Sequence, residues 1–187
     1  LSDYCEYLHS QILSAILSLT GREISVDDAA RIAILARTAD LVSLMAQQII
    51  FMAKSLKRMN EKKFALSEDS YKGILEMASH CRENIEYLLT TFPEISENID
   101  KKMRHNDELL RQLLNWHYKT HLIRLAAKSD SSGMFSEVIF SFERIGSIIR
   151  ELRKTTISMS VHASALNVPD LIDQPHQDNG IQEDEIR

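Results

Sequence analysis

Hydrophobic residues recur at every third or fourth position over most of this chain, which is the period of an amphipathic helix. The first 20 residues show the pattern clearly, with one apolar face formed by Tyr4, Leu8, Ile12, Ala15, Ile16 and Leu19. Four longer stretches repeat it. The pattern therefore predicts five helices, over residues 4–19, 26–59, 67–92, 94–127 and 134–163.

The residues between these stretches supply the signals that begin and end helices. Ser25 and Ser67 stand where an N-cap side chain can accept a hydrogen bond from the first turn. Gly21 suits the left-handed residue after a helix. Pro93 is expected to end the third helix and to begin the fourth, because its ring presets the first turn. Residues 129–133 (SDSSG) have the composition of a loop.

Composition supports the same fold class. The 187 residues include only five glycines and three prolines, too few for many short strands and turns. No stretch approaches about 20 uninterrupted apolar residues, so no membrane-spanning segment is expected. The chain begins at Leu1 without a signal-peptide pattern, and we interpret it as a piece or processed product of a longer protein. The prediction is an all-α, antiparallel helical bundle with about five long helices.

Charge divides the chain into a body and a tail. Residues 167–187 hold six acidic residues and one basic residue, which leaves 21 of each sign in residues 1–166. A neutral body offers no basic stripe for phosphate contacts, so no nucleic-acid partner is expected. The tail, 167–187, is predicted to be acidic and irregular. Two short basic strings, Lys62-Lys63 and Lys101-Lys102, fit either solvated helix faces or peripheral contact with anionic lipid.

A weak internal repeat appears at an offset of about one hundred residues. It divides the helical domain, 1–166, into halves of about 1–60 and 67–163, each with a helix, a short loop and a second long helix. The first half then lacks one helix before Leu1. The matching pairs are Leu8 with Leu109, Ile12 with Leu113, Leu13 with Leu114, Leu41 with Phe142, and Leu44 with Ile145.

The segment 141–147, Ser-Phe-Glu-Arg-Ile-Gly-Ser, resembles the signature helix of PhoU domains. With the His121-to-Leu125 stretch and the polar loop before it, the segment is similar to the C-terminal cytoplasmic region of bacterial sodium/phosphate cotransporter-like proteins. The resemblance implies two three-helix repeats and a non-enzymatic regulatory domain at the cytoplasmic side of the plasma membrane. Its expected partners are the transporter membrane domain or a second copy of the chain. The residues that carry the signature or an interaction are His121, Arg124, Glu143, Arg144 and Gly146.

The resemblance leaves alternatives open: a free-standing PhoU-type signalling adaptor, a metal-cluster PhoU protein, or an unrelated bundle. In the family, acids one turn apart hold metal ions, since carboxylates at i and i+4 share a helix face. Here the residue four positions after Glu143 is Ser147, which is not an acid. The matching stretch of the first half begins at Asp40 but has Val42 and Ala46 at the two ligand positions. We therefore predict no metal and no cofactor. Glu143 and Arg144 are expected to form a polar contact between helices.

The remaining chemical candidates are weaker. His117 and His121 have a spacing that can bind zinc, but no third ligand is evident, and surface or half-buried histidines are expected. Cys5 and Cys81 lack a CxxC spacing and fit as apolar core residues, with a disulfide between them left open. Trp116 fits either an interface or the core. No nucleophile, base and acid arrangement and no phosphate-binding loop is evident, so no enzyme is predicted.

Overall fold

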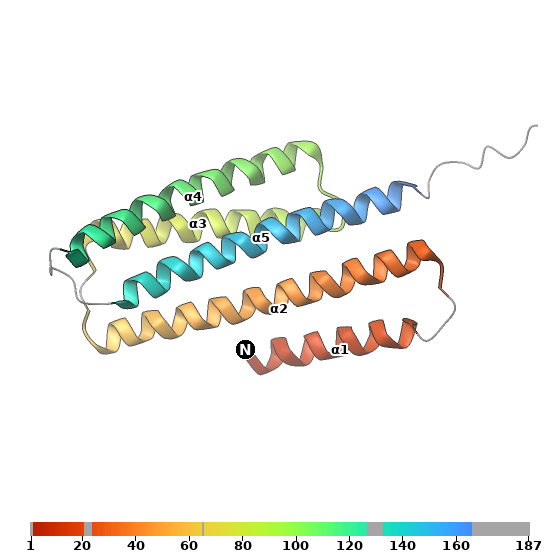
Figure 1. The fold of residues 1–187 in the computed structure, drawn as a ribbon, viewed down its shortest axis with the longest axis horizontal. Helices are drawn as coiled ribbons and strands as arrows, with labels where there is room; N and C mark the ends of the chain where they lie inside the picture. Colours follow the sequence, from red (N-terminus) through yellow and green to blue (C-terminus); the bar gives the residue numbers. More distant parts are fainter. Residues whose placement is uncertain (1, 21–23, 65, 127–132, 166–187) are drawn as a thin grey trace, which may run out of the picture.

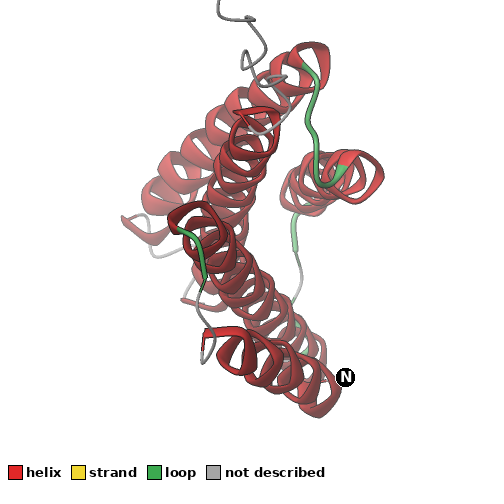
Figure 2. Cartoon of the chain, turned by 90° about the vertical axis from the view of Figure 1, so that its right-hand side faces the viewer, coloured by secondary structure: helices red, strands yellow, loops and turns green. Residues whose placement is uncertain are grey.

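The computed structural model describes residues 2–20, 24–64, 66–126 and 133–165, and this part of the chain is all-α (Figures 1 and 2). The prediction of an all-α bundle with five helices is confirmed. Gly21, the loop at 129–132 and the tail at 167–187 lie outside the described residues. The helices are α1 (Ser2–Thr20), α2 (Val26–Glu61), α3 (Glu68–Thr91), α4 (Glu97–Ala126) and α5 (Gly133–Ala165).

Both predicted N-caps are present. The Ser25 hydroxyl accepts a hydrogen bond from the backbone N–H of Asp28 at 3.1 Å, and the Ser67 hydroxyl accepts one from Ser70 at 3.2 Å. Each of these bonds satisfies a donor that the first helical turn leaves without a partner. The starts of α2 and α3 therefore follow from local sequence alone.

The start of α4 differs from the prediction that Pro93 opens it. The helix begins at Glu97, because Ser96 acts as its cap: the Ser96 carbonyl accepts from the Asp100 N–H at 2.9 Å and its hydroxyl from the Ile99 N–H at 3.4 Å. Pro93 lies in the preceding turn, after a cis peptide bond with Phe92. A serine cap three residues later determines where this helix starts.

Helices α2 and α5 lie side by side along most of their length and run in opposite directions (Figure 1). Helix α1 folds back on α2 and contacts no other helix in the described residues. Helices α3 and α4 form a hairpin whose two members both contact α5. The arrangement is a two-helix unit, α1–α2, joined through α2 and α5 to a three-helix unit, α3–α4–α5.

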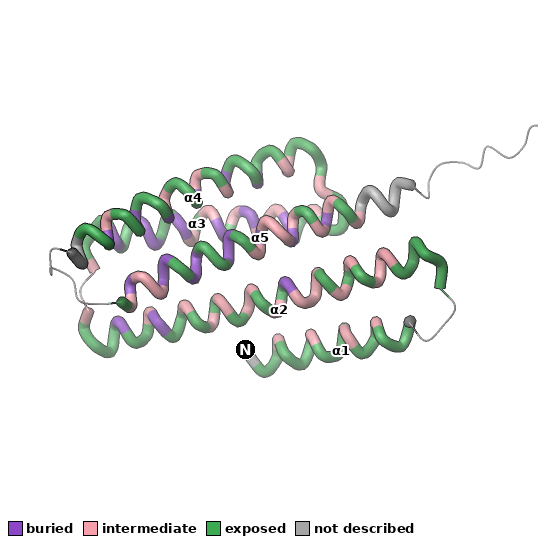
Figure 3. The backbone as a smooth tube through the Cα atoms, viewed as in Figure 1, coloured by how far each residue is buried: buried purple, intermediate pink, exposed green. Residues whose placement is uncertain are grey.

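The hydrophobic core lies mainly in the three-helix unit (Figure 3). Met77, Met103 and Leu110 are at most 1% exposed, and Val138 is completely buried. These side chains come from α3, α4 and α5, so each helix buries one face against the other two. Methionine side chains fill the core at positions 77 and 103 and also at Met59.

The apolar face of α1 is not buried, in contrast to the expectation from its pattern. Tyr4, Leu8, Ile12 and Leu19 all belong to the predicted face and are between 40% and 61% exposed. The reason is that, among the described residues, α2 is the only helix next to α1 (Figure 3). Helical periodicity identifies an apolar face, but a neighbour must be present to bury it.

Both cysteines are free, so no disulfide joins them. Cys81 of α3 is buried, and Cys5 of α1 is half-buried. Burial raises the pKa of the Cys81 thiol to about 12, and the negative charge of Asp107 adds to this effect. The reactive thiolate form of Cys81 is therefore scarce at neutral pH, as expected for a core cysteine.

Candidate functional site

The signature segment 141–147 lies in the first half of α5 and divides its residues between two environments. Phe142 and Ile145 are each 2% exposed and belong to the core. Glu143, Arg144 and Ser147 are exposed. The helical period produces this division, since positions 142 and 145 share one face and positions 143, 144 and 147 project from the other.

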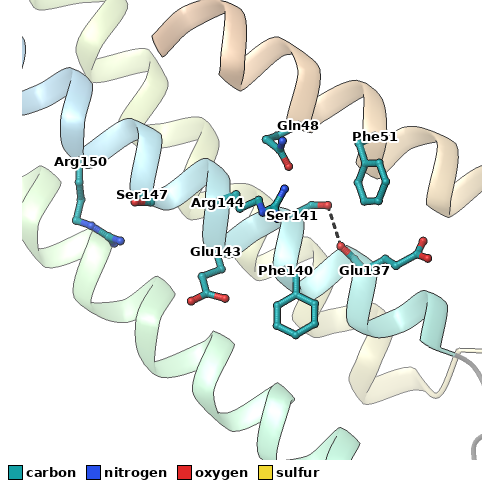
Figure 4. Close-up of a pocket in the computed structure, with 9 residues that line it drawn as sticks. All are labelled: Gln48, Phe51, Glu137, Phe140, Ser141, Glu143, Arg144, Ser147 and Arg150. Carbon is teal, nitrogen blue, oxygen red and sulfur yellow. Dashed lines mark hydrogen bonds between the residues drawn. The ribbon is translucent and has the colours of Figure 1, made fainter. Parts of the chain in front are cut away.

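The exposed residues of the segment line an open pocket of about 650 Å³ between α2 and α5 (Figure 4). Helix α2 contributes Gln48 and Phe51. In the close-up, Glu143 points from α5 toward α4. The α5 residues around the pocket are Glu137, Phe140, Ser141, Glu143, Arg144, Ser147 and Arg150.

A hydrogen-bonded group joins the two helices at one end of this pocket. The buried Ser55 hydroxyl of α2 donates to the Glu137 carboxylate of α5 at 2.8 Å, and the Arg58 guanidinium approaches the same carboxylate oxygen at 2.5 Å. One turn along α5, the Ser141 hydroxyl donates to the Glu137 carbonyl at 2.8 Å (Figure 4). The bonds from Ser55 and Arg58 hold α2 and α5 in register where the pocket begins, whereas the Ser141 bond lies within α5.

Ion pairs on the other side of α5 bind it to α4. The Arg150 guanidinium donates to the Asp107 carboxylate at 2.6 Å, and Arg153 pairs with Asp100. Asp100, Asp107 and Arg153 are 11–13% exposed, so solvent screens these interactions less than it screens a surface pair. The two pairs fix the register of α4 against α5.

Glu143 and Arg144 take no part in these contacts. Neither side chain forms a hydrogen bond or an ion pair within the described part of the chain, and both are exposed. The prediction that they make a polar contact between helices is therefore wrong. Glu137, Arg150 and Arg153 make those contacts, and the charged pair of the signature is left at the protein surface.

Gly146 serves the packing of α5 on α4. A Cβ atom built at this position would lie 2.8 Å from the Leu110 Cδ2 atom, closer than real side chains approach. Gly146 is buried. It is also one of the residues that line a second open pocket, of about 430 Å³, between α4 and α5. Its lack of a side chain permits a close helix approach, which is a structural role.

Asp40 lies apart from the signature residues. It is on α2, and its carboxylate accepts a hydrogen bond from His9 Nε2 of α1 at 2.9 Å. The structure therefore does not bring Asp40 together with Glu143 or Ser147 in one pocket. Asp40 instead links the two helices of the α1–α2 unit.

His117 and His121 are buried, at 4% and 2% exposure, in contrast to the surface or half-buried positions that we expected. The ring of His117 lies against Gly73 of α3, and the ring centroid of His121 is 5.3 Å from that of Phe135. Both histidines project from the face of α4 that packs on α3 and α5. The burial of His117 depends on the close approach that Gly73 allows, which the α4 sequence alone does not reveal.

The two ring nitrogens of His121 have no hydrogen-bond partner among the described residues. A buried polar group without a partner lowers stability, since it loses its bonds to water. We expect His121→Leu to raise the free energy of unfolding by about 1 kcal/mol, measured by urea denaturation. His105→Leu, at an exposed position of the same helix, is the control with little expected change. A loss of stability in His121→Leu alone would contradict this account.

Other candidates contribute little to a site. The Arg124 side chain lies outside the described residues. Trp116 is 53% exposed and stacks edge-on against His117. Lys101 pairs with Glu97 at 2.7 Å, and both side chains are exposed.

The described residues contain no candidate metal site and no candidate membrane span. No group of three or more His, Cys, Asp or Glu side chains there is arranged to hold a metal ion. Within the same part of the chain, no helix combines the length and the apolar character needed to cross a membrane.

Sequence reasoning missed the residues that join the helices through polar contacts, namely Ser55, Asn84, Asp100, Asn106, Asp107, Glu137, Arg150 and Arg153. Asn84 and Asn106 are buried and share a hydrogen bond of 3.4 Å between α3 and α4. A usable signal existed for the arginines, because Gly146, Arg150 and Arg153 follow the helical spacing and share one face of α5.

Comparisons with protein-family models, curated proteins and solved structures found no match to this chain.

Proposed function

We propose that this chain is a PhoU-like regulatory domain of a sodium-dependent phosphate transporter, and that it modulates phosphate transport through protein–protein contact at the cytoplasmic side of the membrane. The observation that carries the proposal is the division within the signature segment. Its apolar residues are buried, while Glu143 and Arg144 are exposed and have no partner in the described residues. The charged pair is thus available to another protein.

The surroundings of the pair favour recognition of a partner. Glu143 and Arg144 lie at a pocket that also presents the Phe51 ring, which is 46% exposed. Aromatic and arginine side chains are the residue types that most often dominate the energy of protein contacts. Salt bridges on either side of the pocket keep α5 in place, so a partner meets a preformed surface.

A second observation supports the repeat architecture that the resemblance implies. The signature helix α5 and the long helix of the first half, α2, are paired antiparallel at the centre of the molecule. A partner that binds this pair with different affinity in two transport states would bias the transporter toward one of them. No catalytic step is needed for this form of control.

The proposal is tested by phosphate uptake in cells that carry the full-length transporter. Deletion of this domain, and the double substitution Glu143→Ala/Arg144→Ala, are both expected to change uptake or its response to phosphate supply. Arg82→Ala is the matched control, because Arg82 is an exposed arginine on α3 away from the pocket. The idea fails if the deletion leaves both uptake and its response to phosphate unchanged.

A further inference from the structure

The pocket between α4 and α5, of about 430 Å³, has a different chemistry from the pocket between α2 and α5. Three of its lining residues, Leu110, Leu114 and Ile139, belong to the core and are between 1% and 9% exposed. Its volume lies within the range of small-ligand pockets, about 300–1,000 Å³. The pocket therefore offers an apolar base on which the stem of an incoming side chain can rest.

Two aromatic rings also line this pocket, one from each helix. The ring centroids of Tyr118 on α4 and Phe140 on α5 are 5.9 Å apart, and the rings are inclined at 56° to each other. The two residues are 39% and 45% exposed, so part of each ring is open to a ligand. The face of an aromatic ring carries negative charge density and attracts cations. The rings therefore favour a positively charged group.

The charged side chains of the pocket leave one charge uncompensated. Arg150 donates to the Asp107 carboxylate at 2.6 Å. Arg111 pairs with Glu108, and its Nε atom lies 3.5 Å from the Asp107 carboxylate. Both arginines are thus neutralised by acidic side chains of α4. Glu143, the third charged residue of the lining, forms no hydrogen bond or ion pair within the described part of the chain, so the unpaired charge of the pocket is negative.

The two charged residues of the signature belong to different sides of α5. Glu143 lines both pockets, whereas Arg144 lines only the pocket between α2 and α5. In the close-up, Glu143 and Phe140 project from the side of α5 that faces α4 (Figure 4). Adjacent residues of a helix do not face each other. Arg144 therefore does not neutralise Glu143, and the carboxylate remains open to a cation from outside the chain.

We propose that the α4–α5 pocket binds an arginine side chain of a partner protein, with its guanidinium paired to Glu143 beside the rings of Tyr118 and Phe140. A guanidinium is planar, can donate two hydrogen bonds to one carboxylate and stacks on aromatic rings, whereas a lysine ammonium is a compact and strongly hydrated charge. The apolar stem of the arginine would lie on Leu110 and Leu114. The inference rests on the proposed function, since it assigns a chemistry to the surface that is proposed there to contact another protein.

Other kinds of side chain fit the pocket less well. An acidic group would be repelled by Glu143, and it would find Arg111 and Arg150 already paired with carboxylates of α4. A purely apolar group would remove water from the Glu143 carboxylate without replacing its hydrogen bonds, which costs free energy. A basic side chain with an apolar stem satisfies the carboxylate, the rings and the apolar base together.

Titration of the purified chain with N-acetyl-arginine N-methylamide, followed by two-dimensional ¹H–¹⁵N NMR, tests the proposal. A salt concentration of about 20 mM keeps the screening of an exposed carboxylate weak. The amide signals of Tyr118, Phe140 and Gly146 are expected to shift and saturate with a millimolar dissociation constant, because a single side chain makes few contacts. The citrulline analogue, which has a similar shape but no charge, is expected to bind about tenfold more weakly. Equal binding of the two probes, or no saturable shift at these amides, overturns the proposal.

Substitutions separate the contribution of the charge from that of the rings. Glu143→Gln keeps the size of the side chain and is expected to weaken binding of the arginine probe about tenfold. Tyr118→Leu removes one ring and is expected to weaken it about two- to fivefold. Glu76→Gln, at an exposed glutamate of α3, is the matched control and is expected to bind as the wild type does. Unchanged binding in Glu143→Gln overturns the pairing and with it the proposal.

The two proposals fail in different experiments. Binding of the probe is measured on the purified chain without a transporter, so absence of binding overturns this inference and leaves the regulatory function to the uptake test. Binding of the probe, together with uptake that does not respond to deletion of the domain, supports the arginine pocket and overturns the proposed function.

Discussion

Phe142→Ala is expected to lower the free energy of unfolding by about 3–5 kcal/mol, the range typical of a phenylalanine removed from a protein core. Phe142 is 2% exposed and is among the largest fully buried side chains of the described residues. It lies on α5 in the core that α3, α4 and α5 share. Truncation would leave a cavity at this junction, and the helices cannot move together to fill it while Arg150 and Arg153 hold α4 in register. Urea denaturation followed by far-ultraviolet circular dichroism measures the effect.

Phe140→Ala is the control for this prediction. Phe140 lies two residues away on the same helix but is 45% exposed, with its ring near Tyr118. Its removal is expected to cost less than about 1 kcal/mol, because little buried area is lost. Equal effects at the two positions would show that the core of the three-helix unit is not centred on Phe142.

Gly73→Ala is expected to destabilise the protein by about 2–3 kcal/mol, the upper part of the range for an overpacked core. A Cβ atom at this position would lie 1.8 Å from the His117 Nε2 atom, so the imidazole ring would have to leave its place. His117 is 4% exposed, with its ring against Gly73 of α3 and near Phe135 of α5. Alanine is the better helix former by about 1 kcal/mol, so a net loss must come from the clash.

A double-mutant cycle isolates this clash. Gly73→Ala is expected to cost much less in a His117→Ala background, where the space next to residue 73 is free, and the coupling should reach about 1–3 kcal/mol. Gly133→Ala is the control, because nothing lies within 4 Å of a Cβ at that position. It is expected to be neutral or slightly stabilising. Additive effects of Gly73→Ala and His117→Ala would contradict the contact between them.

The structure assigns different tasks to the residues of the signature segment. Phe142, Ile145 and Gly146 maintain the packing of α5, whereas Glu143 and Arg144 take part in no contact within the described residues. A sequence motif of this kind therefore contains some residues that are needed for folding and others that are exposed at the protein surface. Substitutions at Phe142 should act through stability, and substitutions at Glu143 and Arg144 through contact with a partner.

Local sequence alone determined the helices and most of their ends. The three-to-four-residue period predicted all five helices, and Ser25 and Ser67 marked two starts correctly. These features depend on interactions between residues close in the chain, such as a cap hydroxyl and an N–H three residues later. The start of α4 was misplaced because two local signals, Pro93 and Ser96, competed within a few residues.

Only the tertiary structure decided which faces are buried. An apolar face on α1 and one on α5 look alike in sequence, but within the described part of the chain α5 has three neighbouring helices and α1 has one. For the same reason, the burial of His117 depends on Gly73, a residue 44 positions away on another helix. Burial results from the juxtaposition of surfaces that are remote in the chain, and a helical period carries no information about which surface will lie opposite.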